Sequence, residues 1–287
     1  MSYARLLEEW HGLLERRPAF RSPLASYEPI LTAWAAWAEA PFAPLRWTAD
    51  DCRERWRRGT PLLSEAAPSI SPEAMEPLLE PVLDLLATSG VEPEALRRFA
   101  DAWDRGDIGP SALFPGLGRI GSTSVQLDTG LSQEGVGFLA CASLRPILEA
   151  FFAECRSHLG GDVWHLGICP FCGAPPGFAD LSDDGQRRLA CHLCGGSWGF
   201  SRLRCPHCGT ARAQDFVRLL AEDHEEGYAI FACKACLGYV KELDRRVRWN
   251  TVSALVEDWG SPHLDLIARR AGYWRPVPTL IQLAHAD

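Results

Sequence analysis

The stretch that decides the fold begins at Cys169-Pro170-Phe171-Cys172-Gly173 and ends at Cys233-Lys234-Ala235-Cys236. Within it, eight of the chain's 11 cysteines form four CxxC pairs: Cys169/Cys172, Cys191/Cys194, Cys205/Cys208 and Cys233/Cys236. Each pair offers two thiolates, and two pairs brought together by a hairpin complete a tetrahedral shell around one metal ion. Four pairs therefore predict two metal centres.

The four pairs form a short internal repeat, duplicated once. In each half, the insert between the two pairs has the pattern of a β-hairpin, with turns at Asp184-Gly185 and at residues 222–227. A third short strand is expected after each unit, at residues 197–200 and 238–240. This pattern predicts local pairing, with 169/172 joining 191/194 and 205/208 joining 233/236. Interleaved pairing is the alternative, and spacing alone does not exclude it.

Metal binding is favoured over disulfides, because four disulfides would need an oxidising compartment and would make an unusual CxxC scaffold. An all-sulfur tetrahedral site suits zinc or a mononuclear iron of the rubredoxin kind, and the spacing does not separate them. Four thiolates leave no open coordination position, so the centres are expected to be structural or electron-carrying rather than hydrolytic. His192 and His207, inside their pairs, are expected to point away from the metal. The other cysteines are read as small buried hydrophobes: Cys52, Cys141 and Cys155.

The N-terminal half has helical periodicity. Apolar residues recur at helical spacing in the first 14 residues, at about 26–40 and at 95–103. Ser71-Pro72 is an N-cap followed by proline, and Gly90 ends that helix. Another helix is expected from Leu139 to about His158, with Pro146 starting a new helix within it or kinking it. The tryptophans at helical spacing are read as core. After the cysteines, residues 253–272 are expected to be helical and the apolar tail to pack on the protein.

These segments predict an α+β protein. We expect an irregular all-helical domain over residues 1–161, with its boundary at Gly160-Gly161. Two small rubredoxin-like or zinc-ribbon modules follow at 162–203 and 204–250, and a C-terminal helix and tail at 251–287. With 287 residues, 47% of them hydrophobic, the chain has ample material for such a core.

Composition bears on compartment and partners. The N-terminus starts an amphipathic helix rather than a signal peptide, and no apolar run is long enough to span a bilayer, so neither export nor membrane insertion is expected. Thiol-rich metal sites then predict a cytoplasmic protein. The net charge is −8, and both hairpin tips are acidic, which disfavours nucleic acid. Five arginines could still gather on one face, although a solvated surface is the simpler interpretation: Arg202, Arg204, Arg245, Arg246 and Arg248.

No convincing catalytic motif occurs, so an enzyme is not expected. Gly116-Leu117-Gly118-Arg119-Ile120-Gly121 matches G-x-G-x-x-G literally, but no convincing strand precedes it. Residues 115–130, rich in Gly, Ser and Thr, are expected to form a long loop.

The full pattern resembles the formate dehydrogenase accessory protein (FdhE) family. The resemblance rests on the four CxxC pairs, on Gly185-x-Arg187-x-Leu189 before Cys191, on Tyr239-Val240-Lys241, and on the late segment from Ser261 to Tyr273. It implies a cytoplasmic accessory factor for respiratory formate dehydrogenases, which are molybdenum and selenium enzymes assembled before twin-arginine export. It also implies binding to the catalytic subunit and two rubredoxin-type iron ions on the eight paired cysteines.

Two other functions stay open on the sequence. One is a zinc-ribbon adaptor that binds nucleic acid or the transcription or translation machinery, with zinc in place of iron. The other is a rubredoxin-like electron carrier or thiol oxidoreductase. Self-association is allowed by the apolar tail and the tryptophans, but no residue pattern demonstrates it.

Overall fold

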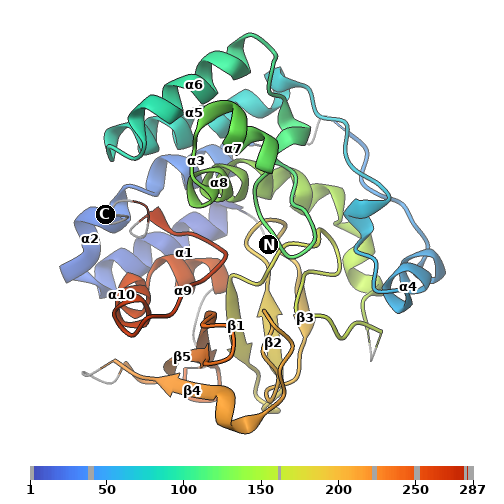
Figure 1. Cartoon of the computed structure of the whole chain (residues 1–287), viewed down its shortest axis with the longest axis vertical. Helices are drawn as coiled ribbons and strands as arrows, with labels where there is room; N and C mark the ends of the chain where they lie inside the picture. The colour runs from blue at the N-terminus through green and yellow to red at the C-terminus, as the bar shows by residue number, and fades with distance from the viewer. Residues whose placement is uncertain are drawn as a thin grey trace.

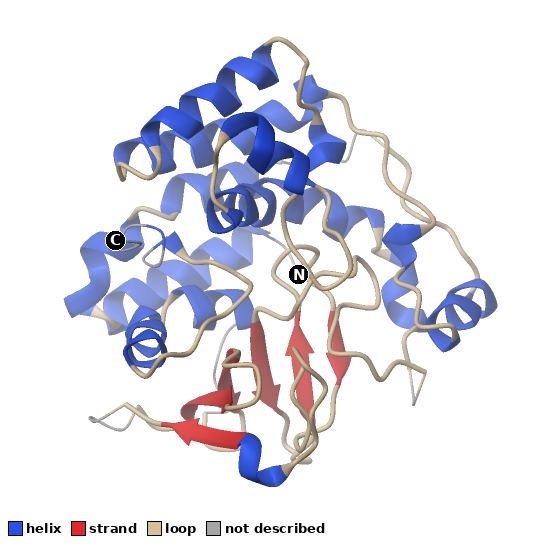
Figure 2. Cartoon of the chain, viewed as in Figure 1, coloured by secondary structure: helices blue, strands red, loops and turns tan. Residues whose placement is uncertain are grey.

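The computed structural model describes residues 3–37, 42–160, 163–221, 225–248, 253–280 and 283. Helices fill one end of the molecule and the strands lie together at the other (Figure 2). The predicted α+β architecture is confirmed: a helical region, two four-cysteine modules and C-terminal helices follow one another along the chain. Gly161, and residues 222–224 of the second hairpin tip, lie outside the described residues.

The longer helices before the cysteines are α1 (Tyr3–Arg16), α2 (Arg21–Ala25), α3 (Glu28–Ala36), α4 (Ala49–Arg57), α5 (Pro72–Thr88), α6 (Pro93–Asp104), α7 (Thr123–Thr129) and α8 (Gln133–Phe151). Short 3-10 turns lie between and after them, at η1 (Pro18–Phe20), η2 (Leu62–Ser64), η3 (Pro110–Leu113) and η4 (Glu154–His158). The strands are β1 (Phe178–Leu181), β2 (Arg187–Ala190), β3 (Ser197–Gly199), β4 (Phe216–Leu219), β5 (Tyr228–Cys233) and β6 (Tyr239–Asp244), with η5 (Ala213–Asp215) before β4. Helices α9 (Ala254–Trp259) and α10 (Pro262–Arg270) follow.

Helix α8 forms the centre of the helical region. Every residue from Gly135 to Leu148 is buried, so this helix is covered on all sides rather than on one stripe. It runs through Pro146 as one helix. The indole Nε1 of Trp34 donates to the Ala142 carbonyl at 2.7 Å, which gives this buried polar group its partner.

The two ends of the chain pack together. Trp259 of α9 stacks on Tyr27 with ring centroids 4.4 Å apart, and it meets Trp10 of α1 edge to face. The blue α1 and the red α9 accordingly lie near each other in Figure 1. The predicted core role of the tryptophans is confirmed for Trp10, Trp34 and Trp56, which are fully buried.

The expectation of a loop over residues 115–130 is wrong in its second half. Helix α7 begins there because the Ser122 hydroxyl caps it and accepts from the Ser124 N–H at 3.2 Å. Gly130 ends it at a φ of +76°, which glycine adopts without steric cost. The apolar pattern of this segment is too short to predict a helix, and the helix starts where it does because Ser122 caps its N-terminus.

The two modules share one six-stranded sheet in the order β3-β2-β1-β6-β5-β4. The hairpins and third strands predicted in each module are confirmed. The modules join through β1 and β6, which pair in parallel with Phe178 opposite Lys241, while every other pairing is antiparallel. One face of the sheet packs Phe178, Ile230 and Leu243 against α10.

Candidate metal centres

The structure gathers the eight paired cysteines into two groups of four. One group is Cys169, Cys172, Cys191 and Cys194, and the other is Cys205, Cys208, Cys233 and Cys236. Within each group the Sγ atoms all lie within 4.8 Å of one another. The predicted local pairing is therefore confirmed. None of the 11 cysteines forms a disulfide.

The spacing of the sulfurs fits a tetrahedral metal ion. With a metal–sulfur distance of about 2.3 Å, the edge of the tetrahedron is about 3.8 Å. The Sγ atoms of Cys169 and Cys194 are 3.5 Å apart, as are those of Cys172 and Cys191. In the second group, the corresponding separations are 3.7 Å and 3.8 Å. Each group can therefore hold one ion with at most small shifts of the sulfurs, and this geometry is shared by zinc and iron.

The thiols require a cation to ionise together. Burial raises the pKa of Cys169 and Cys172 well above the ordinary value, and it raises the pKa of Cys205 to about 11. In the first group, hydrogen bonds from the neighbouring thiols outweigh burial and lower the pKa of Cys194. One low pKa beside raised ones is typical of a cluster that keeps a single thiolate when no cation is present. Metal binding would therefore release protons from both groups.

The chain turns away after each cysteine pair in a left-handed conformation. Gly173, Gly195 and Gly209 have φ values of +80°, +69° and +76°. The fourth turn lacks glycine, and Leu237 adopts a φ of +59° in the same place. A side chain in this region costs about 1–2 kcal/mol, so the fourth turn holds strain that the other three avoid.

The two centres differ in burial. All four cysteines of the first are buried, and Cys169 and Cys194 belong to the main hydrophobic core with residues of the helical region. In the second, Cys208 is exposed and Cys236 is half-buried. The sequence repeat does not distinguish the two halves, because the difference comes from what packs against each of them.

Two arginines bind the backbone of the turn between Cys191 and Cys194 in the first centre. Arg145 of α8 donates through Nη1 to the carbonyls of His192 at 2.9 Å and Cys191 at 3.3 Å. Arg156 of η4 donates through Nη2 to the Cys194 carbonyl. These guanidinium groups also place positive charge beside a cluster that would carry net negative charge when four thiolates bind a divalent ion.

His192 is no ligand of the first centre, as predicted. Its Nε2 lies 2.8 Å from the Asp258 carboxylate, and its ring is buried against Gly177, where a Cβ would come within 2.2 Å. Burial lowers the pKa of His192, although Asp258 opposes this shift. A glycine is therefore required at residue 177 for the ring to reach its partner.

Asp258 belongs to a buried charge network that sequence reasoning missed. Lys241 Nζ lies 2.9 Å from Asp258 and 2.7 Å from Asp265, and Arg275 binds both carboxylates at 2.8–3.0 Å. All four side chains are at most 2% exposed. One feature of the sequence could have indicated this network, namely the lysine of Tyr239-Val240-Lys241 inside an otherwise apolar strand. A buried lysine in this setting requires carboxylate partners.

The second centre is held by fewer hydrogen bonds from surrounding side chains than the first. His207 Nε2 lies 3.1 Å from the Tyr239 carbonyl oxygen, so it is not a ligand either. The Gly238 N–H donates to the Cys236 sulfur at 3.4 Å, the kind of contact that spreads thiolate charge. Trp274, half-exposed, donates through Nε1 to the Cys236 carbonyl at 2.9 Å.

The remaining cysteines are buried in the helical region, as predicted. Cys155 donates to the Leu45 carbonyl at 3.2 Å. Burial raises the pKa of Cys52 to about 12 and keeps its thiol neutral.

Among the described residues, no helix combines the length and the apolar character that crossing a bilayer requires.

The fold and the site define an α+β protein with two rubredoxin-like, four-cysteine metal-binding groups. No protein-family model matches the chain. It is 35% identical over 118 residues to a "Protein FdhE homolog" of Stutzerimonas stutzeri, with 40% of this chain and 38% of that protein covered. It is 30% identical over 151 residues to one of Aquifex aeolicus, covering 51% and 52% of the two chains. The chain thus matches about half or less of the length of these curated relatives.

A crystal structure of the FdhE protein from Pseudomonas aeruginosa has the same fold, with a TM-score of 0.63 and 24% identity, over 100% of this chain and 96% of that one. Together, the relatives and the shared fold support the resemblance to the FdhE family that the cysteine pattern indicated.

Proposed function

We propose that this chain is a cytoplasmic, non-enzymatic accessory factor that binds the catalytic subunit of a respiratory formate dehydrogenase and supports its maturation or activation before export. The observation that carries the proposal is the pair of four-thiol groups with tetrahedral spacing, in a chain whose relatives bear the FdhE name. The divisions at residues 161, 203 and 250 remain predictions.

In this proposal the eight paired cysteines are the metal ligands, and iron is favoured over zinc because of the family resemblance. Iron held by four thiolates supplies a one-electron couple, whereas zinc supplies only a cross-link. The protein's own contribution is to hold the sulfurs at the observed spacing, to exclude water from the first group, and to place Arg145 and Arg156 beside it.

The difference in burial suggests a division of labour. The first group lies in the core and joins the helical region to the sheet, so it serves as a structural cross-link. The second group presents Cys208 at the surface, where another protein can approach its metal. A partner that exchanges an electron with the accessory factor would therefore meet the second group.

Affinity capture from the native host tests the role. Tagged protein is recovered from cells grown with formate respiration induced, and the bound proteins are identified by mass spectrometry. The expected result is enrichment of a formate dehydrogenase catalytic subunit by the wild type and by Cys52→Ser, which leaves both groups intact. Recovery of a polymerase, ribosomes or nucleic acid in its place would instead establish the ribbon-adaptor function.

Metal identity is tested on the purified protein. Elemental analysis is expected to give two ions per chain, with the visible charge-transfer absorption of a ferric tetrathiolate if iron is native. The zinc-loaded protein should then fail to support client activation if the redox couple is used. Full activation by the zinc form would reduce both centres to structural cross-links.

A further inference from the structure

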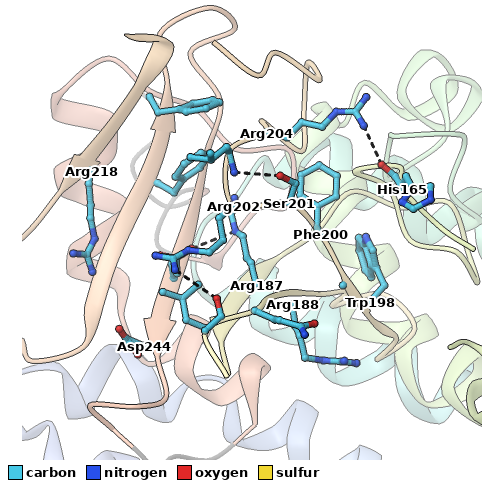
Figure 3. Close-up of a pocket in the computed structure, with 18 of the residues that line it drawn as sticks. His165, Arg187, Arg188, Trp198, Phe200, Ser201, Arg202, Arg204, Arg218 and Asp244 are labelled. Atoms are coloured by element: carbon cyan, nitrogen blue, oxygen red, sulfur yellow. Dashed lines mark hydrogen bonds and ion pairs between the residues drawn. The ribbon is translucent and has the colours of Figure 1, made fainter. Parts of the chain in front are cut away.

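The face of the sheet opposite α10 forms the floor of a cleft of about 1390 Å³. All six strands contribute to its lining, together with the segment 200–204 that links the two modules. The register explains the floor. Leu181 of β1 lies between Arg187 of β2 and Asp244 of β6, and Phe231 of β5 lies opposite Arg218 of β4. Figure 3 shows Arg187, Arg202, Arg204 and Arg218 around this cleft.

The cleft is basic in an acidic protein. Six arginines line it against two carboxylates, Glu242 and Asp244, while the whole chain carries a net charge of −8. Glu242 pairs with Arg187 and Asp244 with Arg246. Of the other arginines, Arg188 lies opposite Asp180 and so belongs to the far face of the sheet. Among the residues that the structure describes, no ion pair is formed by Arg202, Arg204 or Arg218. Three of the five arginines that the sequence singled out, Arg202, Arg204 and Arg246, gather at this cleft, and Arg202 and Arg246 remain exposed to solvent as expected.

A buried donor points to a bound ligand. The Arg187 side chain is 0% exposed, lies over the Phe231 ring at 4.2 Å and has its Nε 3.2 Å from Glu242. Neither Nη atom has a hydrogen-bond partner among the described residues. Because a buried guanidinium without partners is costly, its free fork is suited to a carboxylate from outside the chain.

We propose that this cleft binds an extended acidic segment of a partner protein, with its carboxylates on the arginines and its apolar side chains on the sheet. The volume exceeds the roughly 300–1000 Å³ of small-molecule sites. Five strand spacings of about 4.8 Å span about 24 Å, which about seven extended residues would cross. The proposal does not depend on which protein supplies the segment, so its failure would leave the accessory role intact.

Single-stranded nucleic acid fits less well. Such ligands stack their bases on free aromatic faces. Here Trp198 and Phe200 are buried, Phe216 packs on Phe231 with centroids 5.0 Å apart, and Arg187 covers the Phe231 ring.

The test is fluorescence anisotropy with the full-length, metal-loaded protein. The probe is a labelled 12-residue peptide in which glutamate alternates with phenylalanine or leucine. Three comparison ligands are a peptide with glutamine for glutamate, one with lysine for glutamate, and a 12-nucleotide single-stranded DNA. The acidic peptide is expected to bind in the micromolar range, more weakly as salt is raised, and more tightly than the other three.

The variant Arg202→Glu/Arg218→Glu changes two exposed cleft arginines and is expected to weaken the acidic peptide at least about tenfold. Its matched control is Arg21→Glu/Arg57→Glu, the same charge change at exposed helical positions away from the cleft, where less than about a twofold effect is expected from screened charges. Arg187→Lys, which keeps the charge and removes the fork, should weaken binding several-fold. Equal losses in cleft and control variants, no binding of the acidic peptide, or tighter binding of the DNA would each overturn the proposal.

Discussion

His192 Nε2 lies 2.8 Å from Asp258 Oδ2, and this contact joins the turn between Cys191 and Cys194 to helix α9. Asp258 in turn binds Lys241 of β6 and Arg275. One buried carboxylate therefore connects the first cysteine group to a strand of the second module and to the C-terminal helices. The stability of the first group thus depends on residues far from it in the sequence.

Asp258→Asn should strongly destabilise the protein. The change leaves Lys241 and Arg275 buried with one carboxylate between them, and breaking such a buried pair costs about 3–5 kcal/mol in the free energy of unfolding. Urea denaturation followed by circular dichroism measures the change. The control is Asp107→Asn, an exposed pair with Arg105 for which we expect about 0.5 kcal/mol or less. Similar small effects in both variants would contradict the structural importance of the network.

The same variant makes a prediction about pH. Burial raises the pKa of Asp258, but Arg275 and Lys241 outweigh burial and hold it well below its ordinary value of 3.8. The unfolded chain therefore binds the proton first as pH falls. The stabilisation by Asp258 is complete above about pH 5, declines once the pH passes the ordinary value of 3.8, and is lost as the pH falls through the lowered folded-state pKa. The difference in unfolding free energy between wild type and Asp258→Asn should be constant from pH 7 to 5.5. Below about pH 4 the difference should shrink as pH falls, and a difference that stays constant down to about pH 3 would show that the pKa of Asp258 is not lowered.

Arg145→Met should weaken metal binding at the first group only. The arginine donates to the carbonyls of Cys191 and His192, and losing such a support typically lowers metal affinity about 10–100-fold. Competition with a chromophoric chelator measures both sites in one titration. The second group serves as the internal control, because Arg145 does not contact it. Equal weakening of both sites would indicate a general loss of folding.

Chelation should empty the second group first. Cys208 is exposed, whereas all four thiolates of the first group are buried. Alkylation after brief chelation, read by mass spectrometry, should label Cys205, Cys208, Cys233 and Cys236 before any cysteine of the first group. Cys52 should stay unlabelled at pH 8, since burial raises its pKa to about 12. Earlier labelling of Cys169 or Cys172 would reverse the assigned roles.

Leu237→Gly should stabilise the protein slightly. Leu237 adopts a φ of +59°, and relief of this strain outweighs the extra freedom of glycine in the unfolded chain by about 0.5–1 kcal/mol. Gly209→Ala, at the matching turn with a φ of +76°, should destabilise by about 1 kcal/mol. Thermal unfolding of the metal-loaded proteins compares the two, and a destabilised Leu237→Gly would mean that the half-exposed leucine makes contacts worth more than its strain.

The sequence by itself determined the local features. CxxC spacing, a hairpin-length insert and the turn at Asp184-Gly185 all act within about 30 residues, so the two four-cysteine groups and their pairing could be predicted. Helical periodicity and the Ser71-Pro72 cap likewise predicted α1 and α5. Helix α7 was missed because its apolar pattern is short, and its serine cap was read as part of a loop.

Only the tertiary structure decided how these parts meet. The parallel pairing of Phe178 with Lys241 fuses two modules into one sheet, and nothing local in either strand selects that partner. The same pairing turns one face toward α10 and leaves Arg187 and Phe231 on the other, which makes the cleft. It also brings Lys241 to Asp258 and Asp265. Burial of a charge depends on which distant groups surround it, and a one-dimensional pattern does not contain that information.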